Sequence, residues 1–283
     1  MPELSPTPNA SLRQPVIILD DVYKSFGQDE RRSQPLRGVT LSINRGEKLV
    51  IIGPSGTGKS VTLRMIMGLI EPDQGRVVVM GRDLGQTSRH ELWNIRKHMS
   101  MLFQGGALFD SMTIGENVAF PLREAGEKDQ EKIRLTVNHL LGEVGLPGVE
   151  DKMPSEISGG MQKRAALARS LACSPEIILY DEPTTGLDPV MADSISSLIL
   201  ATHASITDIT SVVVTHDMLV AQKVADRVVM LFSGQVVADA PPDFFLRMAN
   251  LPEDEFSRET NAHARLIRQF VRGEATGPIR TVF

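Results

Sequence analysis

Short apolar runs of strand length alternate in this chain with longer segments of helical periodicity. The runs are rich in β-branched residues, which favours buried strands. They cover Val16–Leu19, Leu36–Ile43, Lys48–Ile52, Arg76–Met80, Glu176–Tyr180, Ser211–Thr215 and Arg227–Phe232. We expect helices from Lys59 to about Ile70, over Val190–Ala204 and over Met218–Ala225. Strands that alternate with helices predict an α/β fold with a mainly parallel sheet.

The segment from about residue 87 to residue 170 has a different pattern. Its apolar positions recur every three or four residues, which predicts a helical insertion in the α/β core. The first 85 or so residues instead mix antiparallel strands with one strand–loop–helix unit. We therefore expect a flexible tail over 1–15, a core domain over 16–249 with a helical subdomain at about 87–170, and a C-terminal extension over 250–283.

The C-terminal extension carries one apolar stripe at helical spacing. Its members are Phe256, His263, Leu266, Ile267, Phe270 and Val271. Gly273 is expected to end the helix, and the glycine- and proline-containing end to run on extended. Such a stripe either folds onto its own domain or crosses to a second copy. We hypothesise that the extension contributes to dimerisation or complex assembly rather than to catalysis.

Composition narrows the class of protein. Of the 283 residues 41% are hydrophobic, and the formal net charge is −5, which argues against a nucleic-acid partner. The single cysteine, Cys173, excludes an internal disulfide and is expected to be a small buried hydrophobe. No apolar run reaches the ~18 residues of a membrane span, and the start lacks the basic and apolar parts of a signal peptide. We expect a cytoplasmic protein that reaches the membrane only through a partner.

The strongest chemical motif is a phosphate-binding loop between the strand Lys48–Ile52 and the following helix. It reads Gly53-Pro54-Ser55-Gly56-Thr57-Gly58-Lys59-Ser60, a full match to G-x-x-x-x-G-K-[ST] in the context that the motif requires. Glycines let backbone N–H groups wrap a polyphosphate at a helix N-terminus. Lys59 is expected to reach the β and γ phosphates, and Ser60 to ligate Mg²⁺.

A second motif places two carboxylates at the end of a buried strand. Asp181 and Glu182 follow Ile177–Tyr180, at the strand end where α/β sheets bind ligands. We expect Asp181 to hold Mg²⁺ through water and Glu182 to activate the water that attacks ATP.

A third motif, Ile157-Ser158-Gly159-Gly160-Met161-Gln162, precedes a helix and resembles the LSGGQ signature of ABC ATPases. Ser158, Gly159 and Gly160 open that helix, so their N–H groups form a second anion cradle. Met161 replaces the usual glutamine but leaves both glycines intact. The residues that match further family motifs in order are Phe26, Gln104, Asp188 and His216.

The ABC resemblance assigns a role to each matching residue. It implies that Phe26 stacks on adenine, with Tyr23 a weaker candidate, and that Gln104 contacts Mg²⁺ and senses the γ-phosphate. It implies that Asp188 lies in the loop that crosses to a second subunit and that His216 is a catalytic switch. Two ATP molecules are then sandwiched between two copies, each contacted by Ser158, Gly159, Gly160 and Gln162 of the opposite copy.

Several segments resemble more closely the cassette subunits of Mla/Mce-type phospholipid transporters. They are MSMLFQGGALFDSMTIGENVAFPLRE, MPSEISGGMQKRAALARSLA and RQFVRGEATGPI. This resemblance implies phospholipid transport between the inner and outer membranes. It also implies that the chain itself lies on the cytoplasmic side of the inner membrane. The implied partners are a multispanning permease, a periplasmic lipid-binding protein and a STAS-domain protein. An apolar set, Leu108, Phe109, Met112 and Phe120, is a candidate groove for a partner's helix, with ordinary domain packing as the alternative.

Other functions remain open at this point. The cassette of another transporter, such as an amino-acid importer, would carry the same ATPase motifs. A non-transport ABC ATPase of translation would normally have two cassettes in one chain, and one of DNA repair a long coiled coil; neither feature is present. The presence of both Glu182 and His216 argues against a non-enzymatic nucleotide sensor.

Overall fold

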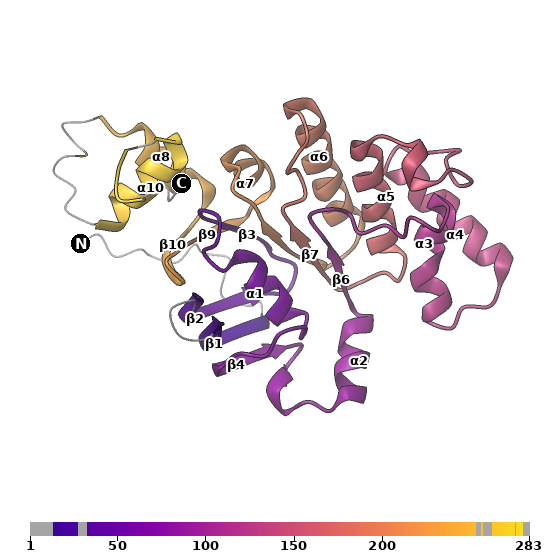
Figure 1. Cartoon of the computed structure of the whole chain (residues 1–283), viewed down its shortest axis with the longest axis horizontal. Helices are drawn as coiled ribbons and strands as arrows, with labels where there is room; N and C mark the ends of the chain where they lie inside the picture. Colours follow the sequence, from indigo (N-terminus) through magenta and orange to yellow (C-terminus); the bar gives the residue numbers. More distant parts are fainter. Residues whose placement is uncertain (1–13, 28–32, 253–255, 257–261, 275, 280–283) are drawn as a thin grey trace.

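Two β-sheets form the framework of the protein. The computed structural model describes residues 14–27, 33–252, 256, 262–274 and 276–279. The smaller sheet is antiparallel, with strand order β2-β1-β4-β5, and the larger has the order β10-β9-β3-β8-β7-β6 (Figure 1). The strands are β1 (Pro15–Phe26), β2 (Ser33–Asn44), β3 (Lys48–Ile52), β4 (Gln74–Val79), β5 (Arg82–Asp83), β6 (Met99–Leu102), β7 (Ile177–Asp181), β8 (Thr210–Val214), β9 (Arg227–Phe232) and β10 (Gln235–Ala240).

Within the larger sheet, β9, β3, β8, β7 and β6 are parallel and β10 is antiparallel at the edge. The α-helices are α1 (Lys59–Ile66), α2 (Arg89–Lys97), α3 (Ile114–Glu124), α4 (Gln130–Glu143), α5 (Gly159–Leu171), α6 (Pro189–Ser205), α7 (Met218–Val224), α8 (Pro242–Asn250) and α10 (Ala262–Arg272). Short 3-10 turns are η2 (Leu84–Gln86) and η3 (Pro154–Glu156). The expected α/β fold is confirmed: a mainly parallel sheet, an antiparallel sheet and a group of helices, α3 to α5, at the far end of the chain's long axis (Figure 1).

The central strands are buried on both faces, and their side chains divide between two cores. In β3, Leu49 and Ile51 pack with the antiparallel sheet and α1, whereas Val50 and Ile52 pack with the helices on the opposite face. This alternation follows from the two-residue period of a strand. It explains why central strands read as continuous apolar runs in the sequence.

Two differences from the sequence-based expectation bear on the nucleotide site. The expectation of helix throughout residues 87–170 is wrong at β6, which pairs with β7 in parallel. Its sequence, MSML, has no β-branched residue, so the partner strand rather than local propensity makes it a strand. β1 also runs seven residues beyond the expected Leu19, across a register shift at Asp21, where φ is 51°. That extension carries Phe26.

The C-terminal stripe packs onto its own domain, which was the first of the two alternatives. α10 lies against α8 and β10, with Leu266 and Ile267 buried. Arg272 Nε donates to Ala249 O at 2.6 Å, which ties α10 to the end of α8. The helix ends at Gly273, where φ is 66°, as predicted.

Residues 276–279 form bends, so the expectation of an extended end is wrong for this part of the chain. The side chain of Gln269 accepts from Ile279 N at 2.6 Å and donates to Ile279 O at 3.0 Å, which holds the bends against α10. The expected flexible tail lies outside the described residues except for residues 14 and 15.

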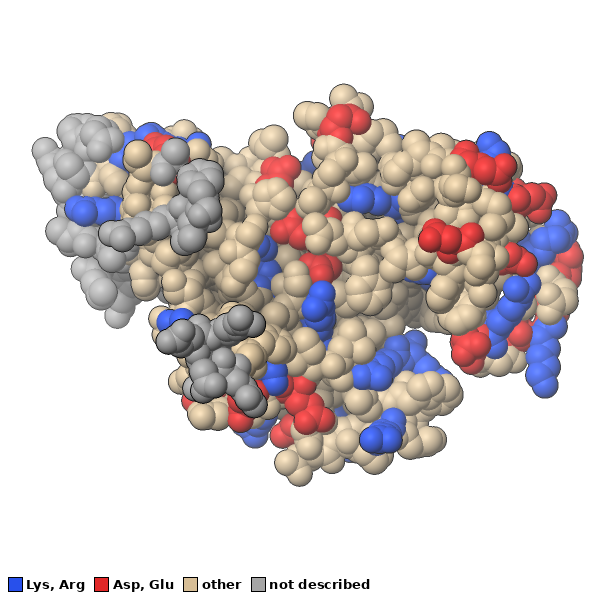
Figure 2. All heavy atoms as spheres, in the orientation of Figure 1, with Lys and Arg blue, Asp and Glu red and all other residues tan. Residues whose placement is uncertain are grey.

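Charge on the face seen in Figure 2 is mixed. Acidic and basic side chains of the described residues are interspersed there, without a continuous basic band. This agrees with the formal net charge of −5, which is small for a chain of 283 residues. None of the described helices is long and apolar enough to cross a membrane.

Candidate nucleotide-binding site

The phosphate-binding loop joins β3 to α1 in a conformation that needs its glycines. Gly53, Gly56 and Gly58 have φ values of 147°, 79° and 98°, where side chains are rarely tolerated. A Cβ on Gly53 would lie 2.1 Å from Leu231 O, and one on Gly58 would lie 2.4 Å from Pro35 O. The loop is therefore fixed in shape by close backbone approach from two directions.

Lys59 is the first residue of α1, and its ammonium lies inside the loop. The side chain is only 6% exposed, and Nζ donates to Gly53 O at 2.7 Å and to Pro54 O at 3.0 Å. Burial lowers the pKa of Lys59, while the charges of Glu182 and Asp181 oppose that shift. The loop thus holds the Lys59 ammonium next to the N-terminus of α1, and this arrangement suits an anionic polyphosphate.

Ser60 and Asp181 bring two oxygen ligands together beside the loop. Ser60 Oγ donates to Asp181 Oδ1 at 2.7 Å, although 121 residues separate the two in sequence. Hydroxyl and carboxylate oxygens are ligands that Mg²⁺ accepts, usually with substrate phosphates completing the shell. The pair therefore fits a Mg²⁺ that arrives with a nucleotide.

Gln104, the third expected Mg²⁺ contact, is exposed just beyond the end of β6. Because β6 and β7 are parallel neighbours, Gln104 and Asp181 both lie at the carboxyl ends of these strands, on the same side of the sheet.

Glu182 adopts a conformation that is unusual for a residue with a side chain. Its φ is 49°, and its N–H donates to Val214 O at 2.9 Å. The carboxylate is 12% exposed; Oε1 lies 3.8 Å from Lys59 Nζ, and Oε2 lies 2.8 Å from His216 Nδ1. Strained backbone of this kind is concentrated at functional sites. The structure thus brings together Lys59, Glu182 and His216, which the sequence motifs single out separately.

Phe26 lies at the edge of the same site. It is 42% exposed and lines a cavity of about 270 Å³ with residues of the phosphate loop and α1. Asp73 fixes the end of β1 by accepting from Lys24 Nζ and from Ser25 N, both at 2.7 Å. The weaker candidate, Tyr23, points its hydroxyl at Gly38 of β2 instead. An aromatic face beside a phosphate loop suits a nucleobase.

The signature lies at the start of α5. Ser158 caps that helix by accepting from Met161 N at 3.3 Å, and Gly160 packs so closely that a Cβ there would lie 2.2 Å from Met191 Cε. Gln162 Nε2 donates to Pro154 O at 2.8 Å, within its own chain. Within the described part of the chain, no hydrogen bond joins the signature to the phosphate loop.

Asp188 caps α6 by accepting from Val190 N and Met191 N, both at 3.0 Å. The capped turn follows Gly186, where φ is 79°. Asp188 therefore fixes the loop between Glu182 and α6 in the position where the resemblance places a subunit-crossing loop.

Two residues near Glu182 were not singled out from the sequence. Thr185 Oγ1 donates to Glu182 Oε2 at 2.8 Å, and Lys163 Nζ donates to Thr185 O. Thr185 follows Glu182 by three residues in a turn, a spacing that suggests such a contact. Lys163 lies on α5, so only the tertiary structure reveals its partner.

Two other expectations need correction or refinement. Cys173 is exposed, not buried: it follows the end of α5 and lines a cavity, whose walls remove enough water to raise the pKa of the thiol. In the apolar set after Gln104, Phe109 and Phe120 pack on each other with ring centroids 4.9 Å apart, and Leu108 packs against the core. Local packing thus accounts for most of that set.

Comparison with known proteins gives consistent matches. Residues 36–185 match the family model described as ABC transporter. A Mycobacterium tuberculosis protein, named as a ribonucleotide transport ATP-binding protein, is 44% identical over 93% of this chain and 68% of its own. The intermembrane phospholipid transport system ATP-binding protein MlaF of Escherichia coli is 39% identical over 85% of this chain and 84% of its own. A dimeric ATP-binding cassette, solved with ADP and phosphate after hydrolysis, has a TM-score of 0.74 and 33% identity, covering 80% of this chain and 98% of that chain.

Proposed function

The chain belongs to the ABC transporter family as an ATP-binding and ATP-hydrolysing cassette, and from that premise we propose that it powers phospholipid transport between the inner and outer membranes. The observation that carries the ATPase part is the convergence of Lys59, Glu182 and His216 beside the Ser60–Asp181 pair. Ionised or hydrogen-bonding groups gathered at the end of a parallel sheet are suited to phosphoryl transfer to water.

Each residue has a proposed role in that reaction. Backbone N–H groups of residues 53–60 and the Lys59 ammonium bind the phosphates, while Ser60, Asp181 and Gln104 hold Mg²⁺. Phe26 stacks on the base. Glu182 orients a water molecule and accepts its proton, and His216 holds the Glu182 carboxylate in place. Bound Mg²⁺ would supply charge neutralisation at the phosphates.

The site is proposed to be completed by a second copy. The N-terminal end of α5, with Ser158, Gly159 and Gly160, presents backbone N–H groups that are suited to an anion. The dimeric state of the solved cassette that this chain resembles supports the same arrangement. In the proposed dimer of this chain, five residues of one copy face the nucleotide of the other: Ser158, Gly159, Gly160, Gln162 and Asp188.

Cross-linking tests this arrangement. An ATP analogue with a photoreactive γ-phosphate, bound to a mixture of two chains with tags of different length, should label Ser158 of one chain while occupying the phosphate loop of the other. When the loop lysine is removed, Lys59→Ala, from one tagged chain only, mixed dimers should carry label on that chain, because the phosphate loop that still binds ATP lies in the other. Parental homodimers label the chain that retains Lys59. Labelling confined to the chain that retains Lys59 would contradict the sandwich.

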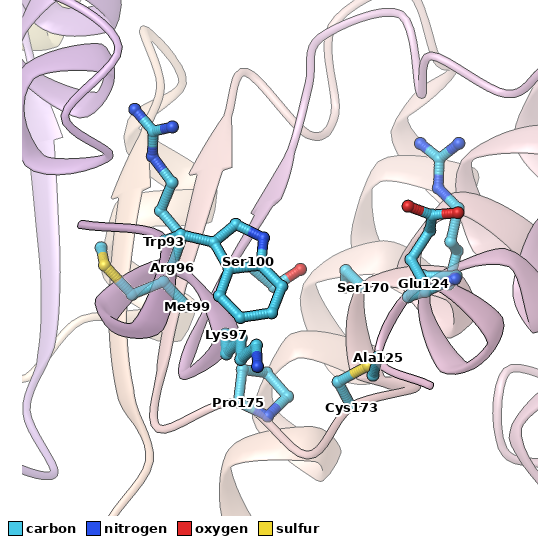
Figure 3. Close-up of a pocket in the computed structure, with 12 residues that line it drawn as sticks. Trp93, Arg96, Lys97, Met99, Ser100, Glu124, Ala125, Ser170, Cys173 and Pro175 are labelled. Carbon is cyan, nitrogen blue, oxygen red and sulfur yellow. The ribbon is translucent and has the colours of Figure 1, made fainter. Parts of the chain in front are cut away.

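The permease is proposed to dock in a cavity of about 420 Å³ beside β6. Figure 3 shows Trp93 and Lys97 of α2 on one side of it and Ser170, Cys173 and Ala125 on the other. Trp93 is half exposed, with Lys97 Nζ 3.4 Å from its ring centroid. The cavity is lined partly by apolar residues and carries more basic than acidic side chains: Arg96, Lys97 and Arg169 against Glu124. Such a lining suits a short helix with an acidic residue. The cavity lies at the start of β6, and the other end of the same strand leads to Gln104, so a helix bound here would contact the strand that precedes a residue of the ATP site.

A cavity-filling substitution tests both the docking site and the cargo. The tagged full chain, extracted from membranes of its own organism, should copurify a multispanning permease together with phospholipid, detected by mass spectrometry. Ala125→Trp should lower permease recovery at least about tenfold, because the indole occupies the cavity. Ala201→Trp, a matched change on the exposed surface of α6, should leave recovery unchanged.

The two sets of relatives differ in the cargo that their names state, ribonucleotide or phospholipid. We favour phospholipid because the sequence segments around Gln104, the signature and the C-terminus resemble phospholipid cassettes. Recovery of a permease without enriched phospholipid, or with Ala125→Trp unchanged, would contradict the respective part of this proposal.

A further inference from the structure

The carboxylate proposed as the base is held by a second side chain that is absent from the ABC motifs discussed above. Glu182 Oε2 has two neighbours at 2.8 Å, His216 Nδ1 and Thr185 Oγ1. The Thr185 hydroxyl donates, since an ionised carboxylate only accepts. Thr185 is itself fixed by its N–H, which donates to Glu182 O at 3.2 Å. The His216 side chain is 57% exposed, whereas Thr185 is half-buried in the turn that follows Glu182.

The backbone of the same residue is held from another helix. Lys163 Nζ, on the second turn of α5, donates to Thr185 O. Burial lowers the pKa of Lys163, and the charge of Glu182 opposes that shift. A charge-assisted hydrogen bond of this type is about twice as strong as a neutral one.

A second contact joins α5 to α6, the helix that follows the turn containing Thr185. Gly160, in the signature, packs against the Met191 side chain at the start of α6, close enough to leave no room for a Cβ. The turn from Glu182 to Asp188 therefore lies between α5 and α6, with Lys163 bonded to it and Asp188 capping the helix that Gly160 contacts. A shift of the α5 N-terminus would act on this turn directly.

From these contacts we propose that Thr185 is a positioning residue for Glu182 and that Lys163 couples it to the signature helix. The inference rests on the proposed function, because it assigns the α5 N-terminus to the ATP of the partner copy. Within one chain, α5 then senses one nucleotide while Glu182 acts on the other. The Lys163–Thr185–Glu182 connection makes hydrolysis at one site depend on occupancy of the second.

The threonine is tested by steady-state ATP hydrolysis of the full chain in its permease complex. Thr185→Ala should lower kcat about tenfold and change KM for ATP by less than about twofold, because binding groups are untouched and only the base loses its donor. Thr185→Ser, which keeps the hydroxyl, should restore kcat to within about threefold of the parent. Thr136→Ala, which removes an exposed hydroxyl on α4, is the matched control and should have parental kcat.

The lysine is tested by the ATP dependence of the rate. The parent complex should have a Hill coefficient above one, and Lys163→Met should lower it to about one. Lys132→Met, on the exposed face of α4, should retain the parental value.

Parental kcat in Thr185→Ala, equal loss in Thr185→Ala and Thr185→Ser, or a Hill coefficient that is the same in parent and Lys163→Met would overturn the inference. Glu182→Gln, measured beside these variants, separates the two levels. If Glu182→Gln is inactive and Thr185→Ala is parental, the positioning role alone fails. If Glu182→Gln hydrolyses ATP at the parental rate, the proposed base itself is wrong.

Discussion

Replacing Glu182 with glutamine is expected to lower kcat for ATP hydrolysis by roughly 10²- to 10⁴-fold, the range that a positioned general base contributes. Glutamine keeps the shape of the side chain, and its amide oxygen still accepts from Thr185 Oγ1. It cannot take a proton from water, so the chemical step loses its base. ATP binding should survive, because the phosphate loop, Lys59 and Phe26 are unchanged.

The measurement is steady-state ATP turnover by the purified complex, paired with equilibrium binding of ATP. Glu131→Gln is the matched control, since Glu131 is an exposed carboxylate on α4 that pairs with Arg134. Turnover by Glu182→Gln within a few-fold of the parent would assign the base to another group. Loss of ATP binding in that variant would show that Glu182 holds the nucleotide rather than the water.

Replacing Lys59 with alanine is expected to have its main effect on binding. Lys59 provides the only side-chain cation within the loop of residues 53–60, and its ammonium already lies among the carbonyls of that loop. Charge-assisted hydrogen bonds contribute about 1.5–3 kcal/mol each, so ATP affinity should fall at least about tenfold. Hydrolysis at subsaturating ATP should fall by at least the same factor.

Equilibrium titration with ATP checks this expectation, with Lys128→Ala on the exposed α3–α4 loop as the control. The melting temperature without nucleotide separates loss of binding from loss of fold. A Lys59→Ala chain with parental melting temperature and parental ATP affinity would refute the assignment of the phosphate loop.

Much of the fold follows from sequence because its central strands are buried on both faces. β3, β7 and β8 are continuous apolar runs, each recognisable without its neighbours. β6 is different, since MSML becomes a strand only through its pairing with β7. β10 was missed for a related reason: it is an edge strand, partly exposed and interrupted by Asp239.

The candidate site divides in the same way. Motifs that are contiguous in sequence, such as the phosphate loop, predict their own local geometry. The link between Ser60 and Asp181 spans 121 residues, and it could be anticipated only because each motif separately assigns its residue to Mg²⁺. Lys163 belongs to no motif that names its partner, and its contact with Thr185 O depends on how α5 packs beside the turn after Glu182. Cys173 was misplaced because the apolar run around it continues past the end of α5.

The central claim is that ATP hydrolysis by this chain drives phospholipid between membranes, and transfer between vesicles tests it most directly. The complete complex, reconstituted in donor vesicles that contain a fluorescent phospholipid, is mixed with acceptor vesicles, and transfer is followed with ATP and Mg²⁺. We predict ATP-dependent transfer by the parent and none above the nucleotide-free rate by Glu182→Gln. Transfer that is equal with and without ATP, or equal in parent and Glu182→Gln, would contradict the claim.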